Sequence, residues 1–225
     1  MAWRSARHGP EHSEQPLAGF KLAHPMLSAD GSRAGFSGVT VGRGHVYLAV
    51  DDAICVQGSR HASPSKWCDC GFYCFHDIAS ARDLACEPEH RNAVLLEVAA
   101  SGRYRRYERG LRYSRQRVRS VHVGRCDCGQ PATVLVDTGA GSTGWRQLLP
   151  TCLACVGARP RLELQAFARL AGHGVTISGE AAPIDADLSG AGQVALLHAE
   201  MALLQARLDD LQSRLEALTR RNDPG

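Results

Sequence analysis

Residues 125–157 read RCDCGQPATVLVDTGAGSTGWRQLLPTCLACVG, and this stretch decides how the chain folds. It carries two cysteine pairs, Cys126-x-Cys128-Gly129 at its beginning and Cys152-x2-Cys155 at its end. Four thiolates make one complete tetrahedral set of metal ligands. We therefore expect a metal ion to close this segment at its base.

The residues between the two cysteine pairs predict a β-hairpin. Residues 133–137 and 145–149 are rich in Val, Leu and Trp, and a glycine-rich turn separates them. A hairpin that folds back on itself brings its two ends together, so both cysteine pairs reach one point. This pattern is typical of a zinc ribbon, in which Zn–S bonds of about 2.3 Å fix the hairpin. An iron–sulfur site is the alternative, because four thiolates suit iron as well.

The nine cysteines of the chain favour metal ligation over disulfides. The count is odd, and the polar first fifteen residues show no apolar core of a secretory signal. No apolar run approaches the length of a membrane span. We therefore expect a cytoplasmic protein without a membrane partner, whose thiols stay reduced.

A second cysteine pair, Cys68-x-Cys70-Gly71, predicts another metal site upstream. Spacing alone leaves its other two ligands open. The candidates are Cys55, His61, Cys74, His76, Cys86 and His90.

The run Cys55-x5-His61-x2-Pro64-x3-Cys68-x-Cys70-Gly71-Phe72-Tyr73, with Gly102-Arg103 and Glu108-Arg109-Gly110-Leu111-Arg112 downstream, carries a family resemblance. Over residues 45–120 the chain resembles an uncharacterised family of proteins from high-GC Gram-positive (actinobacterial) bacteria. That family shows a Cys…His…Cys-x-Cys-Gly stretch followed by a Gly-Arg…Glu-x-Gly-x-Arg stretch. The resemblance implies no activity.

The resemblance does imply Cys55, His61, Cys68 and Cys70 as the ligands of the first site. Cys74 stands where the family more often has alanine, although it could replace His61. Each site then has four protein ligands and no open position, which is the arrangement of structural zinc. We therefore predict two structural Zn²⁺ ions per chain.

Residues 103–119 concentrate positive charge. They hold eight arginines against one acid, Glu108, a local charge of +7; since the whole chain carries +3, the remainder carries −4. Arginines interleaved with tyrosines can bind phosphates and stack on bases. The candidate nucleic-acid ligands are Arg103, Arg105, Arg106, Arg112 and Arg115. The alternative is a solvated face with the tyrosines packed inward.

The end of the chain predicts a coiled coil. Apolar residues recur at alternating steps of three and four along one helical seam. The seam consists of Val194, Leu197, Met201, Leu204, Leu208, Leu211, Leu215 and Leu218. An apolar stripe of this length needs a partner helix, so we expect a homodimer.

These signals predict an α+β protein of small β-rich, zinc-stapled modules followed by a coiled-coil helix. Within it we expect a helix over 78–84 with Asp77 as N-cap and another over 161–170. The expected parts are a disordered leader (1–18), a zinc module with the basic hairpin (19–124), a zinc-ribbon-like module (125–175), a linker (176–192) and the coiled coil (193–222).

The leading functional hypothesis is a zinc-binding, non-catalytic, dimeric protein that binds nucleic acid in a regulatory role. No nucleophile–base pair, phosphate loop or open metal site is recognisable, so we do not expect an enzyme. The first alternative is an adaptor that binds a protein partner through the metal modules and the coiled coil. The second is a thiol redox or metal sensor, in which Cys74 exchanges with a ligand thiolate.

Overall fold

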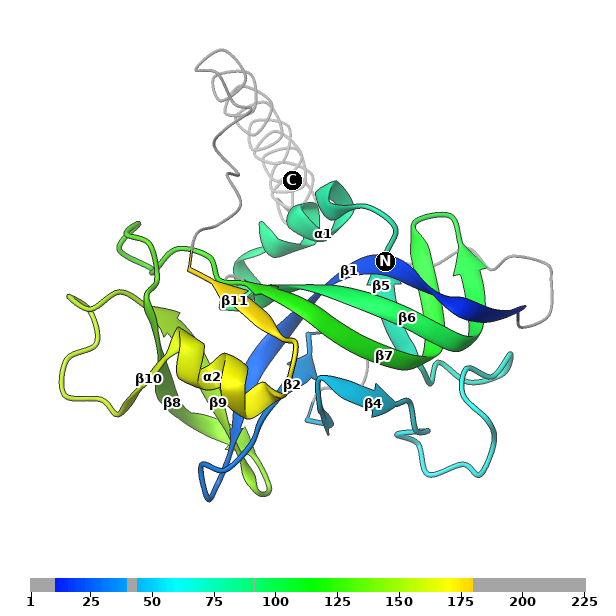
Figure 1. Cartoon of the computed structure of the whole chain (residues 1–225), viewed down its shortest axis with the longest axis horizontal. Coiled ribbons are helices and arrows are strands. Elements are labelled where there is room, and N and C mark those ends of the chain that lie inside the picture. The colour runs from blue at the N-terminus through cyan, green and yellow to red at the C-terminus, as the bar shows by residue number, and fades with distance from the viewer. Residues whose placement is uncertain (1–10, 40–43, 91, 180–225) are drawn as a thin grey trace, which may run out of the picture. The chain divides into compact units, whose positions relative to one another are not determined.

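The computed structural model of the chain describes residues 11–39, 44–90 and 92–179 (Figure 1). These residues belong to one compact unit. Its strands are β1 (Glu11–Ser28), β2 (Ala34–Gly38), β3 (Val46–Tyr47), β4 (Val50–Asp52), β5 (Phe72–Phe75), β6 (Val94–Tyr107), β7 (Gly110–His122), β8 (Val134–Ser142), β9 (Trp145–Thr151), β10 (Arg161–Glu163) and β11 (Thr176–Ser178). Its helices are α1 (Ile78–Ala85), α2 (Leu164–Ala171) and the 3₁₀ helix η1 (Pro88–His90).

Four of the strands close into a ring. β1 pairs with β6, β6 with β7, β7 with β5, and β5 returns to β1 through Phe20 and Phe75. The long hairpin β6–β7 forms much of this ring, as Figure 1 shows. At its other end β1 leaves the ring and pairs with β2 and with β9. All eleven strands therefore belong to one sheet.

Buried and exposed side chains alternate along β7. In β7, Gln116 and Val118 are buried while Arg115, Arg117 and Arg119 are exposed, the period of two expected for a strand with one wet face. Buried side chains of β5, β6 and β7 join those of β2 and α2 in the main core, whose largest fully buried members are Phe36, Tyr113, Phe167, Leu96 and Leu111.

Helix α1 packs a second, smaller core on the sheet. Ala81 and Leu84 of the helix contact Leu22 of β1 and Phe75 of β5. Asp77 caps the helix and accepts a 2.7 Å hydrogen bond from the backbone N–H of Ser80, which confirms the predicted N-cap. The helix expected over 161–170 is shorter than predicted, because residues 161–163 pair with β8 and α2 begins at Leu164.

The α+β class predicted from the sequence is wrong. The described part of the chain is mainly a large, mostly antiparallel sheet, and its two α-helices have eight residues each. Most of the helix in that prediction was the coiled coil over 193–222. Those residues, and with them the predicted dimer interface from Val194 to Leu218, lie outside the described residues.

The structure also differs from the predicted division into parts. Residues 11–18, expected in the disordered leader, begin β1, where Leu17 pairs with Ala100 of β6. The two predicted zinc modules share one sheet, because β9 pairs with β1 and β11 pairs with β7. Residues 176–178, expected in the linker, form that last strand.

Both helices of eight residues are too short and too polar to cross a lipid bilayer. Over the ranges that the structure describes, no helix has the length and apolar character of a membrane span.

Candidate metal centres

The first centre lies where two strands end beside each other on β7. β4 pairs with β7 up to Asp52 opposite Arg115, and β5 begins with Phe72 opposite Tyr113. The loop from β4 to β5 is therefore anchored at both ends on one stretch of β7. This loop carries all four predicted ligands, Cys55, His61, Cys68 and Cys70.

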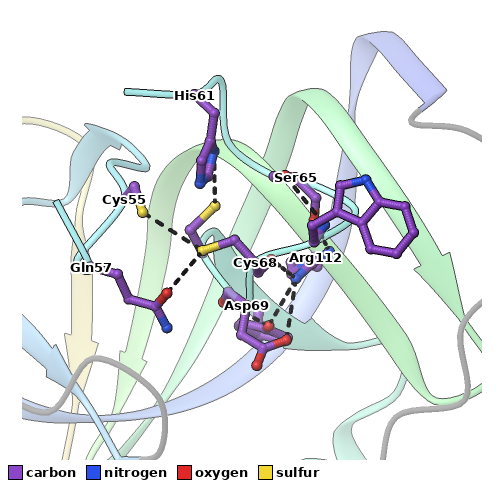
Figure 2. Close-up of polar contacts among 10 residues, drawn as sticks. Cys55, Gln57, His61, Ser65, Cys68, Asp69 and Arg112 are labelled. Atoms are coloured by element: carbon purple, nitrogen blue, oxygen red, sulfur yellow. Dashed lines mark hydrogen bonds and ion pairs between the residues drawn. The ribbon is translucent and has the colours of Figure 1, made fainter. Parts of the chain in front are cut away.

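The structure brings these four side chains together. Their ligand atoms all lie within 4.8 Å of one another. The sulfurs of Cys55 and Cys68 are 3.7 Å apart, and Nδ1 of His61 lies 3.7 Å from the sulfur of Cys70 (Figure 2). The Cys68 thiol also reaches the side-chain oxygen of Gln57 at 3.6 Å.

The second centre lies at the base of the β8–β9 hairpin. Val134 at the start of β8 pairs with Thr151 at the end of β9, so the residues before β8 and after β9 meet. Cys126, Cys128, Cys152 and Cys155 place their four sulfurs within 4.8 Å of one another. The sulfurs of Cys128 and Cys152 are 3.5 Å apart. The hairpin and its closing cysteines are as the sequence predicted.

These separations fit a tetrahedral metal ion and exclude disulfides. An S–S bond is about 2.05 Å long, and all nine cysteines are free. Four sulfurs placed about 2.3 Å from one central ion lie about 3.8 Å from each other by tetrahedral geometry. The observed distances of 3.5 to 3.7 Å match that spacing. Each cluster could therefore hold one metal ion.

Hydrogen bonds prepare some of these thiols for ionisation. Backbone N–H groups of Cys128 and Cys152 point at the Cys126 sulfur and lower the pKa of that thiol to about 7. The Cys155 thiol has its pKa raised to about 12, mainly by its neighbours Cys128 and Cys152. Four thiolates in one small space repel one another, so a cation is needed for all four to be ionised together.

The Cys55 thiol is also shifted toward the thiolate. Its desolvation raises the pKa, but hydrogen bonds from the backbone of Gln57 and Ser59 outweigh that effect and bring the pKa to about 7. A thiolate is the form that binds metal. Both centres therefore contain a cysteine that is substantially ionised near neutral pH.

Comparison with protein-family models, curated proteins and solved structures finds no match to this chain. The ligand sets of both centres are thus defined by the geometry of their side chains.

Arg112 of β7 supports the loop that carries the ligands of the first centre. This arginine is buried in β7, and its Nη1 and Nη2 atoms donate 2.6 Å hydrogen bonds to the backbone carbonyls of Cys68 and Ser65 (Figure 2). It also lies 3.7 Å from a carboxylate oxygen of Asp69. Gly71 makes room for it, because a Cβ there would lie 2.9 Å from Cγ of Arg112 and the backbone has a φ of +124°.

Arg112 therefore has a role that the sequence analysis missed. It was predicted as a nucleic-acid ligand, but its guanidinium is occupied by the metal-binding loop and is shielded from solvent. Arg105, opposite Arg112 on β6, is also buried. Both side chains are buried, so neither is available to a nucleic acid at the protein surface. The sequence feature that could have indicated this role is Gly71, the glycine after the Cys-x-Cys pair, because its close contact is with Arg112.

The other three predicted arginines lie nearer to solvent. Arg106 is exposed, with its guanidinium 5.8 Å from the centre of the Tyr104 ring. Arg115 is exposed and forms a two-point ion pair with Asp52, with distances of 2.7 and 2.9 Å. Arg103 is half-buried.

The remaining candidate ligands of the first centre lie elsewhere. Cys74 is buried in the main core, so it does not replace His61. His76 contacts the backbone carbonyl of Tyr107 at 3.0 Å, and Cys86 is an exposed residue at the end of α1. His90 is buried beside Glu87 and Glu89, which lie 3.6 and 3.5 Å from its Nε2 atom.

Proposed function

We propose that this protein holds two structural Zn²⁺ ions and uses the resulting rigid sheet to bind nucleic acid without catalysing a reaction. The first ion is bound by Cys55, His61, Cys68 and Cys70, and the second by the four cysteines of the β8–β9 hairpin. A tetrahedral set of four protein ligands leaves no position for a substrate or an activated water. The free state of all nine thiols supports a reducing compartment, the cytoplasm.

Zinc is the metal that suits both donor sets. The first set mixes three thiolates with one imidazole, which is a common structural zinc set. The second set has four thiolates, which iron could also use. Both sites have four protein ligands at similar distances from one another, so we assign the same metal, Zn²⁺, to both.

A row of exposed arginines on β7 carries the proposal of nucleic-acid binding. Arg115, Arg117 and Arg119 are alternate residues of one strand, and all three are exposed. Alternate residues of a strand are about 7 Å apart and point to the same side. Arg117 and Arg119 form no ion pair with any acid of the described residues. The row therefore offers positive charge along a line, as a phosphate backbone requires.

The test is the salt dependence of binding to a labelled twenty-nucleotide DNA, single-stranded and double-stranded, by fluorescence anisotropy. We expect the double variant Arg117→Gln/Arg119→Gln to weaken binding and to reduce the salt slope by about 0.7 per lost contact on single strands or about 0.9 on duplex. The control is Arg161→Gln/Arg169→Gln, which removes the same charge from exposed positions outside the row. Equal binding by wild type and both double variants would contradict the proposal.

A protein-binding role is the second candidate, and a separate observation favours it. Large apolar side chains with high exposure stand beside the ligand cysteines. They are Ile54 (59 %), Val56 (46 %), Trp67 (87 %) and Leu153 (59 %). Exposed apolar residues gathered on a rigid support are typical of protein contacts, and tryptophan is frequent at their centres.

The Trp67→Ser variant separates these two functions. Trp67 precedes a ligand but contributes no ligand atom, so both zinc ions should remain bound. If the metal loops serve a protein partner, this variant loses the partner while its DNA affinity stays unchanged. If Trp67 stacks on a base, DNA affinity falls as well.

A further inference from the structure

A cavity of about 740 Å³ is lined by the residues of β5 and by a buried lysine. Lys21 of β1 is only 8 % exposed and lines this cavity together with Tyr47, Phe72 and Cys74. Its ammonium lies 4.4 Å from the centre of the Tyr47 ring and 5.1 Å from that of Phe72. Around Lys21 the cavity thus has an ammonium beside two aromatic rings.

The Lys21 ammonium has little to neutralise it. Its hydrogen bond to the side-chain oxygen of Gln116 is long, at 3.5 Å. That same oxygen already accepts a 3.2 Å hydrogen bond from the Tyr113 hydroxyl. Among the residues that the structure describes, no carboxylate pairs with Lys21. The neighbouring Cys74 thiol has its pKa raised to about 12 by burial, so it is neutral at pH 7.

Other buried donors at this place also lack partners. The Tyr47 hydroxyl and the side-chain nitrogen of Gln116 have no hydrogen-bond partner in the described structure, and both residues are almost fully buried. Buried polar groups are normally paired, so each such group calls for an acceptor. Burial lowers the pKa of Lys21 to about 8, and the amine remains largely protonated at neutral pH. The surroundings of the Lys21 ammonium are therefore rich in donors and short of acceptors.

We propose that this cavity binds a small organic monocarboxylate with a flat, apolar body. The carboxylate accepts hydrogen bonds from the Lys21 ammonium and the Tyr47 hydroxyl, and the apolar body lies against the rings of Tyr47 and Phe72. The buried guanidiniums of Arg105 and Arg112 also line the cavity, but both have partners within the protein, so the negative charge of the ligand is placed at Lys21. Cys70 of the first metal centre also lines the cavity, but neither Lys21 nor Tyr47 is a metal ligand, and the proposal does not depend on the binding of nucleic acid.

The chain offers a direct probe, because Lys21 and Lys66 are its only two lysines. Their side-chain NMR signals can be followed in the zinc-loaded full-length protein while benzoate is added. We expect benzoate to shift the Lys21 signals saturably, and to shift less those of Lys66, an exposed residue that also lines the cavity. Benzyl alcohol, which has the same ring without the charge, should bind at least tenfold more weakly, and inorganic phosphate should not saturate the site.

Variants distinguish a ligand site from a structural lysine. Lys21→Met removes the charge at similar size, so it should abolish benzoate binding while the protein keeps its fold and its zinc. Tyr47→Phe should weaken binding several-fold and leave the Lys21 signal in place. Arg169→Met, at an exposed position outside the cavity, is the control and should bind as wild type does. Absence of a saturable Lys21 shift, or equal binding of benzoate by Lys21→Met and wild type, would overturn the proposal.

Discussion

The Nη1 atom of Arg112 donates a 2.6 Å hydrogen bond to the backbone carbonyl of Cys68. A side chain of β7 thus fixes the backbone of a metal ligand in the loop between β4 and β5. Groups behind the ligands orient them, and their loss commonly weakens metal binding by about 10- to 100-fold. The sheet and the first metal centre are therefore coupled through one residue.

Replacing Arg112 with Gln should weaken zinc binding at the first centre by about 10- to 100-fold, because the loop loses two hydrogen bonds to its backbone. The second centre should keep its affinity. Competition with a chromophoric chelator measures both affinities. The matched control is Arg117→Gln, an exposed arginine of the same strand, which should release zinc as wild type does. Equal zinc release by Arg112→Gln and Arg117→Gln would contradict the supporting role of Arg112.

Replacing Cys128 with Ser should reduce the metal content from two ions per chain to one and make the β8–β9 hairpin sensitive to protease. The reason is that the hairpin would lose the ion that closes its base. Elemental analysis and limited proteolysis followed by mass spectrometry measure these effects. Cys86→Ser removes an exposed thiol outside both clusters and should change neither result.

Gly19 should not tolerate a side chain. A Cβ at this position would clash with the sulfur of Cys74 on the neighbouring strand β5. Gly19→Ala should therefore lower the free energy of unfolding by about 1 to 3 kcal/mol. Addition of Cys74→Ala should recover part of this loss, because it removes the clashing sulfur. Gly124→Ala, where no atom lies within 4 Å, is the control for urea unfolding.

The buried Lys21 should make stability depend on pH. Its pKa is lowered from 10.5 to about 8, so folding disfavours the charged amine. This penalty is complete below pH 8 and disappears as the pH rises toward 10.5, where the unfolded chain also loses the proton. It amounts to about 3 kcal/mol. Wild type should therefore gain stability relative to Lys21→Met between pH 8 and about 10 in urea unfolding. A constant difference across this range would contradict it.

The ion pair between Asp52 and Arg115 should restrain nucleic-acid binding, given the proposed function. Asp52→Asn frees Arg115, and we expect tighter DNA binding with a salt slope steeper by about 0.7 to 0.9. Anisotropy titrations from low to moderate salt measure both quantities. Asp83→Asn makes the same charge change at an exposed position of α1 and should have a smaller effect. If both variants behave alike, Arg115 does not contact the DNA.

The metal ligands could be predicted because their chemistry is local. Cys126 and Cys128 stand at fixed spacing before a hairpin, and Cys152 and Cys155 stand directly after it, so pairing the strands is enough to bring them together. The choice of His61 over Cys74 was harder. It depends on which face of β5 meets the core, and the pairing of Phe72 with Tyr113 decides that.

The closed ring and the buried charges could not be predicted from local patterns. Closure requires β1 to pair with β5 and β6, which are far apart in the sequence. The same pairings bury Arg105 and Arg112, although charge clustering indicated a surface. Lys21 gave no signal either, because a single lysine in a strand is usually exposed. Pairing between strands that are far apart in the sequence thus determines which charged residues are buried.

The most direct test of the two structural zinc centres is the metal content of full-length protein purified without added metal, measured together with its absorption spectrum. We predict two zinc ions per chain, no visible absorption band, and loss of the folded β-sheet signal when a strong chelator removes the metal. Iron with a band near about 400 nm would contradict the assignment of zinc. A chain that keeps its fold with no bound metal would contradict the structural role itself.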